Sequence, residues 1–262
     1  MRYWISLIAI LIVTISCTNK NENGGSAEFE SNSAFGKAST IANERFTKPK
    51  PVLDSTRYNV AFLIMDGTFN TELTAPFDIF QHTIFRENIK AMNVFMVANT
   101  LEPIKTFEGM YILPDFDYTQ SDLPKIDILV VPSAEHHLDT DLEDKALISF
   151  VQKVDKEARF ITSHCDGAFV LAKAGVLDRK VSTTFPSDID KMREMFPELD
   201  IRKDVLFVHD GKYITSAGGA KSFEAALYLA EHLYGAEIAR SLAGGLVIDW
   251  ELEEVPHLIV KE

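Results

Sequence analysis

The chain has 262 residues, of which 46% are hydrophobic and 25% are charged, a globular composition that excludes a mainly disordered, collagen-like or coiled-coil protein. Acidic residues outnumber basic ones by 39 to 26, and the resulting net charge of -13 disfavours binding to nucleic acid or to an anionic membrane through basic patches. The two cysteines, Cys17 and Cys165, are too few for a disulfide framework.

The N-terminus carries the pattern of an export signal. Arg2 precedes an apolar run from Trp4 to Ile15, which is shorter than the roughly 20 residues that a membrane-spanning helix needs. The run leads into Cys17 through a segment that resembles a bacterial lipobox. We therefore expect residues 1–16 to be a signal peptide and Cys17 to carry a lipid anchor. The predicted location is the bacterial cell envelope, at the periplasmic or surface side of a membrane. An ordinary signal peptide with a chance cysteine is the alternative.

Composition divides the rest of the chain into three segments. Residues 17–56 are rich in Asn, Ser, Gly, Lys and Glu without apolar periodicity, which is typical of a disordered tether. Residues 57–250 carry the periodic apolar pattern of a folded domain, and residues 251–262 form an acidic tail.

Apolar runs and helical patterns alternate along the domain. The pattern predicts strands at 58–65, 93–98, 126–132, 159–163 and 180–184, short strands near 105–106 and 111–112, a hairpin of 206–208 with 213–216, and helices at 73–85, 142–156, 167–174, 187–196, 221–234 and 237–242. This alternation indicates a doubly wound α/β domain whose mainly parallel sheet is covered by helices on both faces. Ligands bind such folds beyond the carboxyl ends of the strands.

Cys165 stands where a predicted strand runs directly into a predicted helix. Ser163 and Gly167 flank it at two residues on either side, and small residues allow the sharp turn of a nucleophile elbow. The helix N-terminus would favour the thiolate, so we predict a reactive cysteine. A buried structural cysteine is the alternative.

Four segments together resemble the DJ-1/PfpI superfamily, which has a flavodoxin-like fold. They are residues 64–80, 128–134, 165–178 and 213–227. The nearest branch contains isonitrile hydratases and the amidase-like domains of AraC-type regulators. The resemblance extends over nearly all of the domain and is specific for the superfamily but not for one reaction.

The resemblance implies roles for two carboxyl groups. Glu72 occupies the place of the acidic partner of the cysteine, where it would donate a hydrogen bond to sulfur or act as a general acid or base. A solvated glutamate at a helix start is the alternative. Asp166 follows the cysteine, where isonitrile hydratases usually have Thr and PfpI-type proteases have His. It would either orient water or substrate, or stabilise the first helical turn.

A substrate or oxyanion pocket is expected around the elbow. Its donors would be the backbone amides at Ser133 and Ala134 and those that follow Cys165, including that of Gly167. His136 and His137 follow in the loop and could line the pocket, although a loop histidine is more often solvated. The sequence predicts neither a metal site nor a cofactor site.

Three further positions bear on the mechanism. Phe185 occupies the position where many superfamily members carry a histidine, which counts against protease, glutaminase and glyoxalase-III-like activity. Gly218 would permit close backbone approach beside the pocket, or would simply form a tight turn. His164 is expected to point away from the sulfur.

These observations support two hypotheses. In the first, the protein is a cysteine-dependent enzyme that hydrates or hydrolyses a small isonitrile-, amide- or carbonyl-like electrophile, with Cys165, Glu72 and Asp166 as its catalytic residues. In the second, it is a non-catalytic thiol sensor of oxidants or a ligand-binding module. We discount a DNA-binding regulator because the chain is acidic. A homodimer is possible, with Trp250 and Leu252 as candidates to cover its interface.

Overall fold

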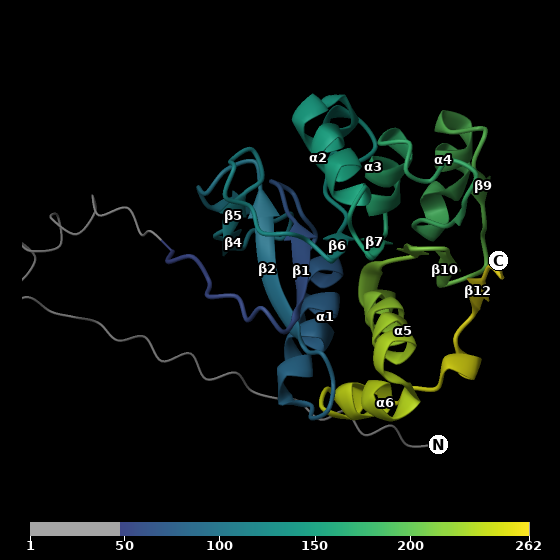
Figure 1. The fold of residues 1–262 in the computed structure, drawn as a ribbon. Coiled ribbons are helices and arrows are strands. Elements are labelled where there is room, and N and C mark those ends of the chain that lie inside the picture. Colours follow the sequence, from purple (N-terminus) through teal and green to yellow (C-terminus); the bar gives the residue numbers. More distant parts are fainter. Residues whose placement is uncertain (1–47, 262) are drawn as a thin grey trace, which may run out of the picture. The chain divides into compact units, whose positions relative to one another are not determined.

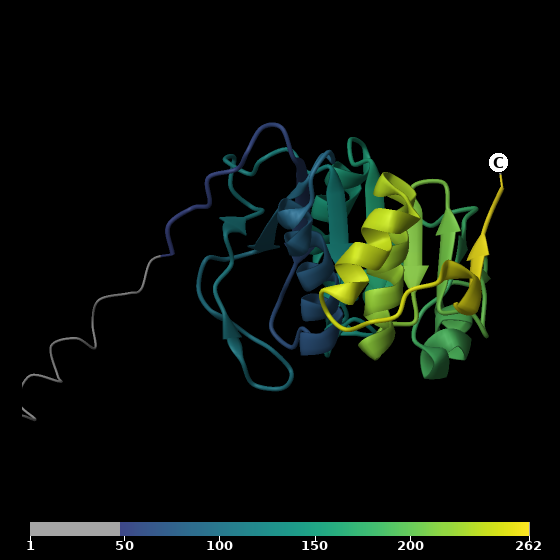
Figure 2. The ribbon, with the colours of Figure 1, turned by 90° about the horizontal axis from the view of Figure 1, so that it is seen from below.

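Eight strands form the central sheet of the computed structural model, which describes residues 48–261. Their order is β12-β10-β11-β7-β6-β1-β2-β5, and every neighbouring pair is parallel except β10 with β11. Helices cover both faces of the sheet (Figures 1 and 2). The predicted doubly wound, mainly parallel fold is therefore confirmed.

The elements have the following bounds in chain order. The strands of the central sheet are β1 Tyr58–Leu63, β2 Met92–Ala98, β5 Phe116–Asp117, β6 Ile128–Val131, β7 Phe160–His164, β10 Phe207–Asp210, β11 Tyr213–Ser216 and β12 His257–Ile259. Two small sheets pair β3 Ile104–Lys105 with β4 Tyr111–Ile112, and β8 Val181–Ser182 with β9 Asp200–Ile201. The α-helices are α1 Asn70–Gln81, α2 Lys145–Asp155, α3 Gly167–Lys173, α4 Ile189–Met195, α5 Ser222–Tyr234 and α6 Ala236–Gly244. Short 3-10 helices are η2 His82–Phe85, η3 Thr140–Glu143, η4 Pro186–Asp188, η5 Gly219–Lys221 and η6 Leu252–Glu254.

Each face of the sheet has its own hydrophobic core, because successive residues of a strand point to opposite faces. In β1, Ala61 and Leu63 pack in the core under α2, α3 and α4, whereas Val60 and Phe62 pack in the core under α1, α5 and α6. Figure 1 shows these two groups of helices on opposite sides of the sheet. Burial of both faces explains why the strands appear in the sequence as continuous apolar runs.

Several elements differ in length from the sequence prediction. Strand β1 ends at Leu63 rather than at residue 65, because the Thr68 hydroxyl bonds to both the N–H and the carbonyl of Met65 and turns the chain. Helix α1 begins at Asn70, three residues early, and the Asn70 N–H donates to the Glu108 carboxylate. Strand β8 stops at Ser182 because the Thr183 N–H donates to the Thr215 hydroxyl and leads the chain towards Cys165.

The segment predicted as an acidic tail contributes a strand to the sheet. Strand β12 pairs in parallel with β10 and forms one edge of the sheet. Trp250 is only 4% exposed, and its indole N–H donates to the Glu231 carboxylate at 2.6 Å. Trp250 is therefore part of the core of its own chain, which corrects its suggested role at a dimer interface. Leu252 is half-buried against the same core.

The end of the predicted tether also contacts the domain. Asp54 and Asn93 exchange two hydrogen bonds, of 3.1 and 2.8 Å, and Lys48 forms an ion pair of 2.8 Å with Asp115. The predicted signal peptide, Cys17 and most of the tether lie outside the described residues. Among residues 48–261, no helix has both the length and the apolar character needed to cross a bilayer.

Candidate active site

Cys165 forms a strained turn between β7 and α3. Its φ angle is +54°, in the left-handed region, which costs a residue with a Cβ atom about 1–2 kcal/mol. The Cys165 N–H donates to the Ser216 carbonyl at 3.0 Å, which ties the turn to the end of β11. Such strain persists only where the surrounding structure imposes the conformation.

Two glycines allow neighbouring backbone to approach this turn. A Cβ atom on Gly218 would lie 2.3 Å from Cys165 Cβ and 2.6 Å from Cys165 N. A Cβ atom on Gly167 would lie 2.1 Å from the Val131 carbonyl oxygen, at the end of β6. Only glycine fits at either position, so the loops after β6, β7 and β11 meet at the cysteine.

The Cys165 thiol is buried between carboxyl groups. The residue is 6% exposed, and its Sγ atom donates to Asp166 Oδ2 at 3.6 Å. Burial is the main cause that raises the pKa of the thiol, and the charges of Asp166 and Glu72 raise it further. The Ser133 hydroxyl has no other hydrogen-bond partner among the described residues. Its hydrogen bond to the sulfur lowers the pKa of the thiol, but by less than burial raises it. Burial and the two carboxyl groups therefore act against the thiolate, which the helix N-terminus was expected to favour.

Asp166 is held by the chain that follows β8. The Thr184 hydroxyl lies 3.0 Å from Asp166 Oδ1, and the carboxyl group makes no side-chain hydrogen bond that caps α3. The alternative that Asp166 stabilises the first turn of the helix by capping is thus excluded. Burial, with help from the charge of Asp188, raises the pKa of Asp166 to about 6. This carboxyl can consequently exchange a proton near neutral pH.

Glu72 reaches the same region from the first turn of α1. It is 7% exposed, which excludes the alternative of a solvated glutamate, and its Oε1 atom accepts a hydrogen bond of 2.9 Å from the Gly219 N–H. Its charge contributes to the raised pKa values of both the Cys165 thiol and Asp166. The structure therefore brings together the thiol and the two carboxyl groups that the sequence singled out.

The amides after β6 are only partly free to bind an oxyanion. The Ala134 N–H donates to His137 Nδ1 at 3.2 Å, so it is not available to a substrate oxygen. This corrects the expectation that both Ser133 and Ala134 would contribute amide donors. The N–H groups of Asp166 and Gly167 lie at the start of α3, where they have no intrahelical acceptor. The Asp166 N–H reaches the sulfur, where its hydrogen bond lowers the pKa of the thiol.

The three histidines near the site have different surroundings. His136 is half exposed and its Nδ1 atom lies 3.3 Å from the Asp139 carboxylate, so it faces solvent. His137 is fully buried, with Nε2 at 3.3 Å from the Met65 sulfur, and burial lowers its pKa to about 3. His164 points to the Ser216 hydroxyl at 3.1 Å, and burial lowers its pKa to about 3 as well. None of the three contacts the sulfur.

A family comparison agrees with this geometry. A model of the DJ-1/PfpI family matches residues 58–232, which contain the elbow, both carboxyl groups and Gly218.

The chain belongs to the DJ-1/PfpI family.

Two relatives and one solved structure illustrate the similarity. The isonitrile hydratase of Pseudomonas putida is 26% identical over 197 residues, which cover 75% of this chain and 78% of the relative. Protein dj-1beta of Drosophila melanogaster is 30% identical over 147 residues, or 56% of this chain and 77% of the relative. The crystal structure of a ThiJ/PfpI family protein from Pseudomonas syringae has a TM-score of 0.65 at 20% identity, covering 80% of this chain and 85% of that one, and shows the shared fold.

Phe185 lies at the position where the sequence resemblance implied a histidine in other members of the superfamily. Phe185 is 38% exposed and directly precedes η4. The charge of Asp188, at the end of η4, contributes to the raised pKa of Asp166. The neighbouring Thr184 is the functional residue that sequence reasoning missed. Its hydroxyl lies 3.0 Å from the Cys165 carbonyl as well as from Asp166. Its position directly before Phe185 was the only available signal.

The site is arranged for proton transfer around a neutral sulfur. Two carboxyl groups lie near one thiol, and the Thr184 hydroxyl contacts one of them, that of Asp166. Within the part of the chain described, no group of three or more His, Cys, Asp or Glu side chains could hold a metal ion.

Proposed function

We propose that this protein is a cysteine-dependent hydratase of a small electrophilic carbon, with isonitriles as the preferred substrate class. The observation that carries the proposal is the contact of 3.6 Å between the Cys165 thiol and Asp166, a carboxyl group whose pKa is raised to about 6. The sequence similarity to an isonitrile hydratase supports the substrate class.

A protonated thiol suits this reaction. In the first step, the Cys165 sulfur bonds to the terminal carbon of the isonitrile, and the thiol proton passes through Asp166 to that same carbon. The product is a thioimidate, R–N=CH–S–Cys, which contains both the sulfur and the proton of the thiol. No histidine is needed to create a standing thiolate, because the proton is consumed in the addition.

Water completes the reaction. Asp166, deprotonated again, takes one proton from a water molecule whose oxygen bonds to the thioimidate carbon, and passes that proton to the nitrogen. The second water proton stays on the added oxygen until it moves to the sulfur. The C–S bond then breaks, the sulfur is reprotonated, and an N-substituted formamide is released. The overall change is the addition of one water molecule to the isonitrile, with no oxidant or reductant. The amides of Asp166 and Gly167 are the donors expected to stabilise the developing negative charge.

Turnover of cyclohexyl isocyanide by the purified full chain tests this proposal. Mass spectrometry should detect N-cyclohexylformamide that contains ¹⁸O when the reaction is run in H₂¹⁸O. We expect Cys165→Ala to abolish turnover and Asp166→Asn to reduce it at least about 100-fold. Equal turnover by Cys165→Ala and the unchanged protein would exclude the mechanism. Release of ammonia from small amides, without formamide formation, would instead favour an amidase.

A thiol sensor is the second candidate, favoured because no imidazole among residues 48–261 forms a hydrogen bond with the sulfur. The raised pKa of the Cys165 thiol weighs against it, because peroxide reacts with the thiolate. Selective oxidation of Cys165 by dilute peroxide, combined with no turnover of isonitriles or amides, would establish the sensor instead.

We further propose that the domain is held at a membrane of the bacterial cell envelope by a lipid on Cys17. This follows from the N-terminal sequence pattern alone. Metabolic labelling with a fatty acid should mark the full chain and should fail for Cys17→Ala. Equal labelling of both would refute the anchor.

A further inference from the structure

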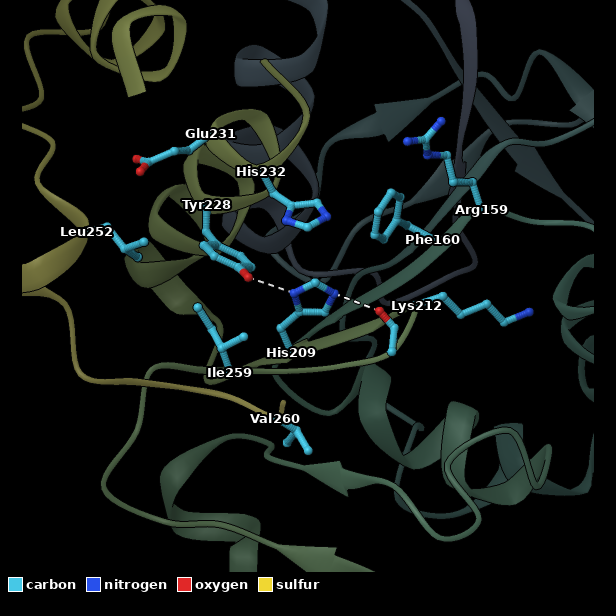
Figure 3. Close-up of a pocket in the computed structure, with 11 residues that line it drawn as sticks. Arg159, Phe160, His209, Lys212, Tyr228, Glu231, His232, Leu252, Ile259 and Val260 are labelled. Carbon is cyan, nitrogen blue, oxygen red and sulfur yellow. Dashed lines mark hydrogen bonds between the residues drawn. The ribbon is translucent and has the colours of Figure 1, made fainter. Parts of the chain in front are cut away.

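A second cavity lies at the end of β7 opposite to Cys165. It has a volume of about 810 Å³ and lies between β7, the β10–β11 hairpin, α5 and the C-terminal segment (Figure 3). Phe160, which lines it, precedes Cys165 by five residues, a separation of about 16 Å along a strand. The cavity is therefore separate from the candidate active site.

Aromatic rings form one wall of this cavity. The His232 ring stands edge-on to Phe160, at 85° and 5.5 Å between centroids, and edge-on to His209, at 86° and 5.0 Å. Tyr228 completes the wall and stands edge-on to His209 at 5.5 Å. His232 is exposed, whereas Phe160, His209 and Tyr228 are at most 6% exposed, so a planar ligand would meet mainly His232 and the small accessible parts of the other rings. Aromatic rings attract one another in stacked and edge-on arrangements.

Hydrogen bonds hold the wall rigid and uncharged. His209 Nε2 lies 2.8 Å from the Gly211 carbonyl, which can only accept, so we assign the proton to Nε2. His209 Nδ1 then accepts from the Tyr228 hydroxyl at 2.6 Å. Both nitrogens of His209 are occupied, and burial lowers its pKa, so it contributes a fixed surface rather than a charge.

Arg159 supplies a cation without a carboxylate partner among the described residues. One of its guanidinium nitrogens lies 3.2 Å from the Tyr58 hydroxyl, and the group lies over the Tyr58 and Phe160 rings. By contrast, Lys212 forms an ion pair of 3.0 Å with Asp155. Arg159 is exposed, so its guanidinium is accessible to an anion at the rim of the cavity.

Two other titratable groups face the cavity. The nitrogens of His232 make no hydrogen bond within the described residues, and partial burial together with Arg159 lowers the pKa of His232. His232 is therefore a neutral donor and acceptor for a ligand. The Glu231 carboxylate already accepts from the Trp250 indole N–H at 2.6 Å, and its charge disfavours a multiply charged ligand such as a phosphate.

The far side of the cavity is closed by residues outside the family match. Leu252, Ile259 and Val260 line it, whereas the match ends at residue 232. Strand β12 holds this segment in place by pairing with β10. The cavity is thus completed by a part of the chain that is not included in the matched DJ-1/PfpI segment.

We propose that this cavity binds a small aromatic carboxylate, with the carboxylate at Arg159 and the ring against Phe160, Tyr228 and the two histidines. A monoanion matches the one guanidinium that lines the cavity, and a planar ring matches the aromatic wall. The site acts independently of the Cys165 reaction, so failure of either proposal leaves the other standing.

Calorimetric titration of the full chain with benzoate, benzamide and acetate tests this site. We expect benzoate to bind with a Kd of about 1 mM or tighter. Benzamide, which lacks the charge, and acetate, which lacks the ring, should each bind at least about tenfold more weakly. Absence of benzoate binding up to about 10 mM, or equal binding of benzamide or acetate, would overturn the proposal.

Three variants locate the binding. Arg159→Gln should weaken benzoate binding at least about tenfold, because it removes the charge. Arg202→Gln is the matched control, since Arg202 is exposed and pairs with Asp200 elsewhere, and it should bind like the unchanged protein. Cys165→Ala should also leave binding unchanged. Unchanged binding by Arg159→Gln, with circular dichroism showing all variants folded, or loss of binding by Cys165→Ala would place benzoate elsewhere and refute the site.

Discussion

The Thr184 hydroxyl lies 3.0 Å from Asp166 Oδ1 and also 3.0 Å from the Cys165 carbonyl oxygen. A hydroxyl carries one proton, so it can donate to only one of these oxygens at a time. An ionised Asp166 can accept that proton, whereas a protonated Asp166 can donate to Thr184 and leave the hydroxyl to donate to Cys165. Thr184 therefore links the protonation of Asp166 to the backbone of the strained turn.

Thr184→Val should shift the pH dependence of turnover upward. The hydrogen bond from Thr184 lowers the pKa of Asp166, so its loss raises that pKa above its present value of about 6. The acidic limb of the profile of kcat/KM against pH should move to higher pH, and Thr184→Ser should keep the original profile. Identical profiles for the Val variant and the unchanged protein would contradict this role.

Asp166 should make the folded state less stable as the pH rises. Its folded pKa of about 6 exceeds the unfolded value of about 3.9, so its contribution to stability is full below about pH 4 and is lost by about pH 6. Urea denaturation gives the free energy of unfolding of Asp166→Asn and of the unchanged protein. From pH 4 to pH 7, the value for Asp166→Asn should rise by about 2 kcal/mol relative to that of the unchanged protein. A difference that does not change with pH would show that this carboxyl is not perturbed.

Glycine should be tolerated at Cys165 better than alanine, because the φ angle there is +54°. Cys165→Gly relieves left-handed strain that Cys165→Ala retains, so the glycine variant should be at least as stable and up to about 1 kcal/mol more stable. Ala172→Gly, inside α3, should instead lower the free energy of unfolding by about 1 kcal/mol or more, because glycine is unfavourable within a helix. Urea unfolding compares the three variants. A glycine variant clearly less stable than its alanine counterpart would argue against strain.

Adjacent glycines should respond very differently to alanine. Gly218→Ala would place Cβ 2.3 Å from Cys165 Cβ and should cost about 3 kcal/mol or more. Gly219 has a φ angle of +57°, but a Cβ atom there would have no neighbour within 4 Å. Gly219→Ala should therefore lower the free energy of unfolding by only about 1 kcal/mol. Thermal unfolding measures both. Similar losses in the two variants would mean that the loops after β7 and β11 do not approach as closely as the structure has them.

Glu72→Gln should change thiol reactivity and turnover in opposite directions. Loss of the Glu72 charge removes one of the causes that raise the pKa of Cys165, so alkylation by iodoacetamide at neutral pH should become several-fold faster, about 3–10-fold. Isonitrile turnover should fall at least about tenfold if Glu72 transfers protons. Glu198→Gln, at an exposed site, should change neither. Slower alkylation by Glu72→Gln would show that its charge does not act on the sulfur.

The sequence predicted the parts of the site that depend on local pattern. Cys165 lies between an apolar run and a helical pattern, and Gly167 follows two residues later, so the turn is visible without any distant contact. Thr184 and the edge strand β12 were not visible in this way. The Thr184 hydroxyl contacts the carboxylate of Asp166 and the carbonyl of Cys165, which lie 18 and 19 residues earlier in the chain. Strand β12 has only three residues, and it forms because β10 offers a free edge to pair with.

The amino-acid sequence by itself determined the layered α/β architecture and the position of the cysteine, because the periodicity of apolar residues is a property of neighbouring residues. Only the tertiary structure decided that the pKa of the Cys165 thiol is raised. Its pKa depends on how completely the loops after β6 and β11 bury it, and on charges brought from Glu72 and Asp166. Likewise, the cavity at Arg159 forms only when the C-terminal segment folds back against α5 and β10. Burial and charge act through space, so they are set by residues that lie far apart along the chain.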